Sequence, residues 1–191
     1  MLTNSDKRYG AVAVTLHWLI AGAIIFMLGL GLYMSDLPLN DANKFPLYQL
    51  HKSIGLTILS LSVLRLGWRA FNRPPPLPAH MPGWERLAAH VSHGLFYLLI
   101  ILVPLAGWAM VSSSPWNIPT IWFGQFQIPH LPGFAEVPDR AATESALKEL
   151  HETLALSMGG LLILHVGAAL KHHFWDRDSV LLRMLPFTSV D

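Results

Sequence analysis

The residues in this sequence best suited to chemistry are its ten histidines, which stand in a chain of 191 residues without a single cysteine. Lack of cysteine removes thiol nucleophiles, disulfides and thiolate ligands for zinc or iron–sulfur clusters. Imidazole nitrogens remain as strong ligands for a transition metal or a haem iron. The chemistry to look for is therefore ligation by histidines that the fold brings together in pairs.

The composition places these histidines in a membrane protein. Hydrophobic residues make up 52% of the chain and charged residues only 13%, whereas about a quarter of the residues in soluble domains are charged. Thirteen Lys and Arg against twelve Asp and Glu leave a formal charge of +1, which is too balanced for a nucleic-acid binder. We expect the lipid bilayer as a partner and no nucleic acid.

Four apolar segments are candidates for membrane-spanning helices. Three uncharged runs are long enough: residues 11–34, 87–111 and 153–170. Pro104 is expected to kink its helix without ending it. The fourth segment has only twelve uncharged residues between Lys52 and Arg65, and these two cations can extend to opposite membrane surfaces. The sequence predicts one all-α domain over residues 1–191, an up-and-down four-helix bundle with helices at about 10–34, 47–70, 86–111 and 146–173.

The positions of Lys and Arg predict how the bundle is oriented. Nine of them lie in the N-terminal segment, the second connection and the C-terminal tail, and four lie in the other two connections and their flanks. By the positive-inside rule both termini face the cytoplasm. The long connection at 112–145 carries aromatic residues among prolines, so we expect it to lie on the outer headgroup layer.

This topology gives four of the histidines a depth in the membrane. His151 and His165 are 14 residues apart on the fourth helix, which corresponds to a rise of about 21 Å on nearly one face. His51 matches His151 near the outer surface, and His17 matches His165 near the inner surface. A lone membrane histidine is as readily a hydrogen-bonded packing residue, but two matched pairs favour the ligand set of two b-type haems.

Spacing alone leaves the inner pair open. His90 and His93 lie three residues apart on one face at the inner end of the third helix, so either His17 or His93 can be the partner of His165. Glycines close to the candidate ligands are expected to let a flat macrocycle approach the backbone. These glycines are Gly22, Gly55, Gly159 and Gly160.

The candidate histidines lie in five short sequence motifs. They are Leu16-His17-Trp18, Leu50 to Gly55, Ala89 to Tyr97, Leu150-His151-Glu152, and Leu164 to Phe174 continuing through Arg177-Asp178 and Leu185-Pro186. Together they resemble the prokaryotic cytochrome b561 family over nearly the whole chain. The last motif is the most specific of the five.

The resemblance implies a bacterial inner-membrane protein of four helices that carries two b haems and exchanges electrons with ubiquinone. Carried over, the family's ligand pairs fall on His17 with His165 and on His51 with His151. The resemblance, and not the spacing, thus selects His17 over His93. His90 and His93 then become candidates for a quinone pocket or for contacts behind the ligands.

The resemblance also implies possible electron donors, since the family includes an enzyme that oxidises superoxide on the periplasmic side and passes the electron to ubiquinone. Other members relay electrons for a periplasmic or membrane redox partner. The outer segments carry seven acidic and four basic residues, which disfavours capture of an anion, although Lys52 and Lys148 could form a local positive entrance. We expect a dihaem quinone-linked oxidoreductase, with superoxide oxidation as its most concrete form and a plain relay as the alternative.

A third hypothesis, a metal or proton transporter, comes from a different class. Ionisable residues within membrane helices commonly mark ion routes. The uncharged runs that define the predicted helices contain no Asp or Glu, so the histidines would have to form such a route alone. This hypothesis is the least favoured of the three.

Overall fold

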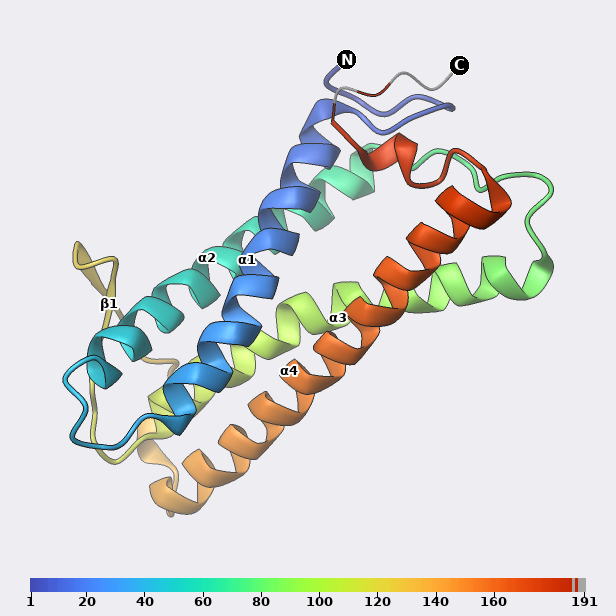
Figure 1. Ribbon diagram of the computed structural model, residues 1–191. Helices are drawn as coiled ribbons and strands as arrows, with labels where there is room; N and C mark the ends of the chain where they lie inside the picture. The colour runs from blue at the N-terminus through green and yellow to red at the C-terminus, as the bar shows by residue number, and fades with distance from the viewer. Residues whose placement is uncertain (187, 189–191) are drawn as a thin grey trace.

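The computed structural model describes residues 1–186 and 188, and four long helices dominate it (Figure 1). They are α1 (Ala11–Asp36), α2 (Lys44–Phe71), α3 (Gly83–Ser113) and α4 (Arg140–Lys171). Each is long and apolar enough to cross a membrane, which confirms the predicted four spans, including the short second segment. The chain runs up and down, so that Met1 and the end of α4 lie at the same end of the bundle.

The helices extend further than the uncharged runs predicted, and α4 shows the largest difference. It begins at Arg140, six residues before the predicted start at 146, because Asp139 caps it by accepting a hydrogen bond from the Ala142 backbone N–H at 3.0 Å. Its first turns carry the charged residues Glu144 and Lys148, so they lie outside the uncharged run at residues 153–170. Pro104 lies inside α3 without ending it, as expected.

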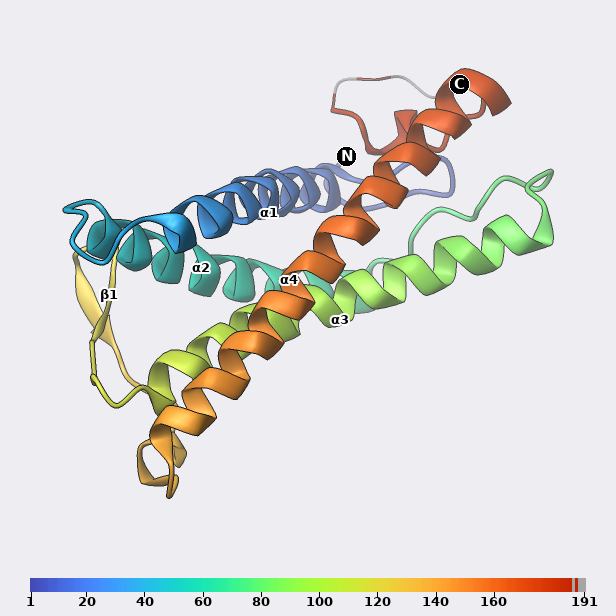
Figure 2. The same cartoon turned by 60° about the horizontal axis from the view of Figure 1, so that its bottom comes forward.

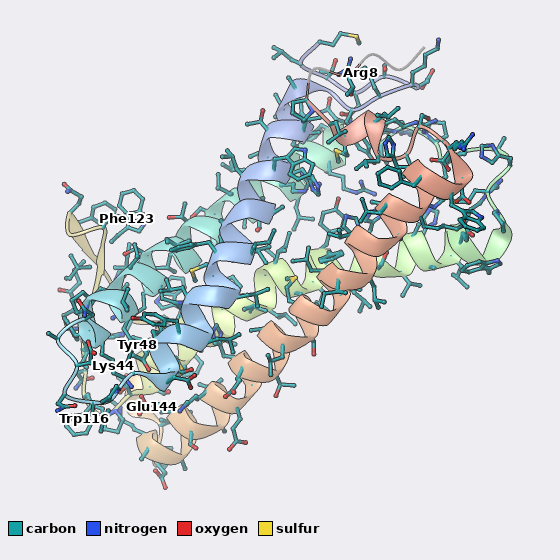
Figure 3. The ribbon with its side chains drawn as sticks, viewed as in Figure 1. Arg8, Lys44, Tyr48, Trp116, Phe123 and Glu144 are labelled. Carbon is teal, nitrogen blue, oxygen red and sulfur yellow. The ribbon has the colours of Figure 1, made fainter. Side chains whose placement is uncertain are left out.

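The connection between α3 and α4 holds a small β-hairpin that the sequence analysis missed. Strand β1 (Thr120–Trp122) pairs antiparallel with β2 (Phe126–Ile128), and a 3₁₀ turn, η1 (Phe134–Glu136), follows. The turn between the strands has left-handed residues at Phe123 (φ 44°) and Gly124 (φ 73°). Figure 3 shows Phe123 at the turn of the hairpin.

Polar side chains of α2 hold the hairpin against the bundle. The Trp122 Nε1 donates to Thr57 Oγ1 at 3.1 Å, and the Gln49 amide pairs with the backbone of Pro119 and Ile121. Ser53, which is 1% exposed, bonds both β1 and the Phe123 N–H. The aromatic segment therefore contains a hairpin that packs on α2, and its place on the outer headgroup layer stays a prediction.

At the opposite end of the bundle, a cluster of ion pairs joins the start of α3 to the end of α4. Lys171 Nζ lies 2.6 Å from Glu85 and 2.8 Å from Asp176, and His172 Nδ1 lies 2.7 Å from Asp178. The chain passes through a π-helical turn, η2 (His172–Asp176), before a last 3₁₀ turn, η3 (Leu182–Met184). These contacts fix where α4 ends relative to α3.

Packing within the bundle is uneven. α1 packs on α2 and α3 on α4, whereas α1 and α4 make few contacts with each other (Figure 2). The apolar core is small and centres on Leu99, Ile100 and Met158. The candidate histidines lie on three of these helices, with His17 on α1, His51 on α2, and His151 and His165 on α4.

Candidate metal-ligating sites

His51 on α2 and His151 on α4 face each other near the end of the bundle that carries the hairpin. Their ring centroids are 6.1 Å apart and their planes are inclined by 76°. Because an imidazole nitrogen lies about 2 Å from a first-row metal ion, two imidazoles on opposite sides of one ion have centroids about 6 Å apart. The spacing of this pair therefore fits one metal ion held between two histidines.

Hydrogen bonding fixes which nitrogen of His151 is available. Its Nδ1 lies 2.9 Å from the Val103 carbonyl oxygen, and a carbonyl can only accept, so Nδ1 carries the proton. In the neutral ring Nε2 is then the free, unprotonated nitrogen, which is the usual state of a histidine that ligates a metal. His51 Nδ1 is buried and has no hydrogen-bond partner among the described residues. Both rings thus suit an iron ligand.

A glycine on α3 makes room for the His151 ring. A Cβ at Gly107 would lie 3.0 Å from His151 Cε1 and 3.1 Å from Nδ1, closer than side chains normally approach. The ring therefore lies directly against the helix backbone, where it can reach Val103. At Gly31 on α1 a Cβ would lie 3.5 Å from His51 Cε1, an ordinary contact.

The glycines that the sequence analysis selected do not meet an imidazole. A Cβ at two of them would have no neighbour within 4 Å, and at the other two it would touch Met27 or Leu28. These four are Gly22, Gly160, Gly55 and Gly159. Gly107 was missed because its importance depends on how α3 is rotated toward α4, and sequence spacing within one helix does not carry that information.

Three histidines meet at the end of the bundle opposite the hairpin, which we call the inner end, the hairpin end being the outer end. The ring of His165 on α4 lies 6.4 Å from that of His17 on α1 and 5.7 Å from that of His93 on α3, with Phe96 edge-on to it at 5.1 Å. Both candidate partners of His165 are therefore within reach, as the spacing had indicated. His90 is exposed, and its Nδ1 lies 2.6 Å from the Arg86 carbonyl of its own helix.

Arg65, which is expected to extend to a membrane surface, lies beside this inner group of histidines. Its Nη1 donates to the Ala13 carbonyl at 3.0 Å, and its Nη2 lies 3.5 Å from His17 Nδ1. The rotation of α2 about its axis turns Arg65 toward α1. An argument from membrane depth alone does not predict this direction. The guanidinium brings a permanent positive charge to the inner histidines.

The outer cations lie mostly against the loops. Lys52 Nζ donates to the Pro119 carbonyl at 3.0 Å, and Lys44 donates to the Leu37 carbonyl and lies 6.0 Å from the Tyr48 ring centre. Figure 3 shows Lys44, Tyr48 and Glu144 together at this end. Lys148 is exposed on α4, three residues before His151. It is the outer cation best placed to meet a solute near the outer pair.

Comparison with known proteins places this arrangement among membrane cytochromes. Residues 8–187 match the family described as prokaryotic cytochrome b561. The chain is 37% identical to cytochrome b561 homolog 2 of Escherichia coli (strain K12), over 99% of this chain and 97% of that protein. It is 31% identical to the probable superoxide oxidase CybB of Yersinia pestis (94% and 97%) and 29% identical to cytochrome b562 of Cereibacter sphaeroides (95% and 98%).

Proposed function

Because this chain belongs to the prokaryotic cytochrome b561 family, whose members are haem b electron-transfer proteins of bacterial membranes, we propose that it carries two haems. His51 and His151 hold the outer haem, and His17 and His165 hold the inner one. The protein passes electrons from a donor on the outer side to ubiquinone in the membrane. The observation that carries this proposal is the facing imidazole pair of His51 and His151, with the Nδ1 of His151 bonded to a carbonyl.

The haem iron supplies a one-electron couple, and the chain supplies its ligands and surroundings. An iron held by two imidazoles would have no open position for a substrate, so such a site would exchange electrons rather than bind oxygen. α4 provides one ligand to each site, with a rise of about 21 Å between His151 and His165. A single helix thereby fixes the relative positions of both sites. Val103 and Gly107 orient the His151 ring at the outer one.

The orientation follows from the distribution of Lys and Arg. We propose that both termini, and the ion-pair cluster at the end of α4, face the cytoplasm across the inner membrane. The hairpin and the outer pair then face the periplasm. On this orientation the outer haem is the entry point for electrons from a periplasmic donor.

The Gly107 contact makes a specific prediction. Gly107→Ala should force the His151 ring away from the Val103 carbonyl, since the added methyl group would lie 3.0 Å from the ring, and the outer haem should be lost or its potential altered. Gly31→Ala is the matched control, because its Cβ would make only an ordinary contact with His51. Visible spectra and redox titrations of the two purified variants test this. Equal behaviour of both variants would contradict the proposed role of Gly107.

Two donors are consistent with the outer site. The printed name of the Yersinia relative, probable superoxide oxidase, favours superoxide. The excess of acidic residues in the outer segments opposes the capture of an anion and favours a relay that serves a redox partner. The exposed Lys148 beside the outer pair is the feature that would help an anion approach.

Replacement of Lys148 distinguishes these donors. If superoxide is oxidised at the outer haem, Lys148→Glu should slow reduction of the haems by superoxide in stopped-flow measurements. Wild-type rates should fall as salt rises, because exposed charges are screened within about 8 Å at physiological ionic strength. Arg8→Glu makes the same charge change at the opposite end (Figure 3) and should have little effect. A slow, salt-insensitive reaction in wild type that ubiquinone does not reverse would leave the relay as the function.

A further inference from the structure

A small cavity at the inner end of the bundle contains two arginines and no acidic residue. Arg65, Trp68 and Arg69 of α2 line it together with Tyr9, which precedes α1, and Tyr97 of α3. Arg65 also touches His17, so the cavity adjoins the inner group of histidines. The cavity and that group therefore share a wall.

The two guanidinium groups in this cavity have no counter-charge among the residues that the structure describes. Arg65 donates to a backbone carbonyl, and the Arg69 guanidinium lies 5.1 Å from the centre of the Tyr97 ring. Within residues 1–186 and 188, neither guanidinium lies within 4.0 Å of a carboxylate. Lys171 at the same end of the bundle, by contrast, contacts two carboxylates. Two cations in one cavity at a membrane surface are unfavourable unless an anion joins them.

Neutral donors complete the lining. Trp68 Nε1 is buried and has no hydrogen-bond partner among the residues that the structure describes, and such a lone donor costs free energy unless a ligand accepts from it. Burial raises the pKa of Tyr9, so its hydroxyl keeps its proton at neutral pH. The cavity offers donors and positive charge, the combination that binds a carboxylate or a phosphate.

We propose that Arg65 and Arg69 bind the carboxylate groups of the inner haem. This inference rests on the proposed function. A b-type haem carries two carboxylates at one edge, which match two arginines in charge, and Arg65 extends from this cavity to the ligand His17. The phosphate of an inner-leaflet phospholipid has related chemistry, but it would not explain why the same guanidinium reaches the iron ligand.

The arginines also set the direction of electron flow. Positive charge beside a haem favours the reduced iron, which carries one positive charge less, so Arg65 and Arg69 raise the inner reduction potential. A higher potential of the inner haem would favour electron transfer from the outer haem to the inner one.

Redox titration of the purified holoprotein tests this proposal in Arg65→Gln and Arg69→Gln. In each variant the inner haem should become at least tenfold harder to reduce, which for one electron is a fall of about 59 mV in its midpoint potential, while the outer potential stays unchanged. Arg73→Gln is the matched control: it removes the same charge from an exposed position four residues after Arg69 and should leave both potentials as in wild type. Within the described residues Arg69 makes no side-chain hydrogen bond to the backbone, so Arg69→Gln tests the proposal even if Arg65→Gln does not fold.

The outcomes separate this inference from the proposed function. If the wild-type protein contained no haem, both the proposed function and the carboxylate site would be wrong. Two haems in wild type, with an unchanged inner potential in Arg69→Gln, would remove the carboxylate site and leave the proposed function standing. Phosphorus analysis provides the second readout: if the variants lose bound phospholipid while both potentials stay constant, the cavity binds a lipid phosphate and the proposal is wrong.

Discussion

Replacing His151 by Ala should reduce the haem content of the purified protein from about two per chain to about one, with loss of the outer haem. The His51 and His151 rings face each other at 6.1 Å, and the hydrogen bond to Val103 holds His151 in the tautomer that ligates through Nε2. Removal of one ligand leaves an iron with a single imidazole in an apolar site. Haem quantification and the reduced-minus-oxidised spectrum measure the loss.

The same pair predicts a non-additive result. His51→Ala should remove the same spectral component, and the double variant should lose no more haem than either single variant, because both residues serve one site. His90→Ala is the control, since His90 is exposed and lies against its own helix. If His151→Ala retained both haems, His51 and His151 would not be partners.

Replacing His165 by Ala should have an equally large effect at the inner end. His165 is the ring that both His17 and His93 approach, so the inner haem should be lost whichever of them is the partner. His17→Ala should lose the same haem, and His93→Ala should retain both. The spectra and redox titrations of the three variants, measured side by side, assign the inner ligands.

These variants distinguish two possible inner ligand pairs, His17 with His165 and His93 with His165, which the distances alone do not separate. The centroid distances to His165 are 6.4 Å for His17 and 5.7 Å for His93, and both suit one metal ion. If His93→Ala lost the inner haem while His17→Ala kept it, the inner pair would be His93 with His165. The outer site and the proposed electron transfer would be unaffected by that result.

The features of the fold that hydropathy controls could be predicted from the sequence. A membrane requires long apolar helices whose backbone groups bond internally, so the four spans follow from the apolar runs. Helical rise then gives each histidine its depth, and the two pairs that depth predicts, His51 with His151 and His17 with His165, lie together in the structure. Their role as ligands remains a prediction.

Features that depend on helix rotation or on polar contacts could not be predicted in this way. Gly107 matters because α3 turns that position toward His151, and Arg65 matters because α2 turns it toward His17. The hairpin is held by a hydrogen bond that Ser53 of α2 donates and by one that Thr57 of α2 accepts, and both residues are distant from it in sequence. The early start of α4 depends on the Asp139 cap, whereas hydropathy detects only its apolar part.

The ratio of haem to polypeptide in the wild-type protein shows directly whether the chain holds two haems. A pyridine haemochrome assay, with protein measured by amino-acid analysis, should give about two b-type haems per chain, both six-coordinate. That result is expected if each end of the bundle holds one iron between facing imidazoles. A value of about one haem per chain would contradict the proposal of two haem sites. A colourless protein that binds zinc would contradict haem binding altogether and favour the transporter hypothesis.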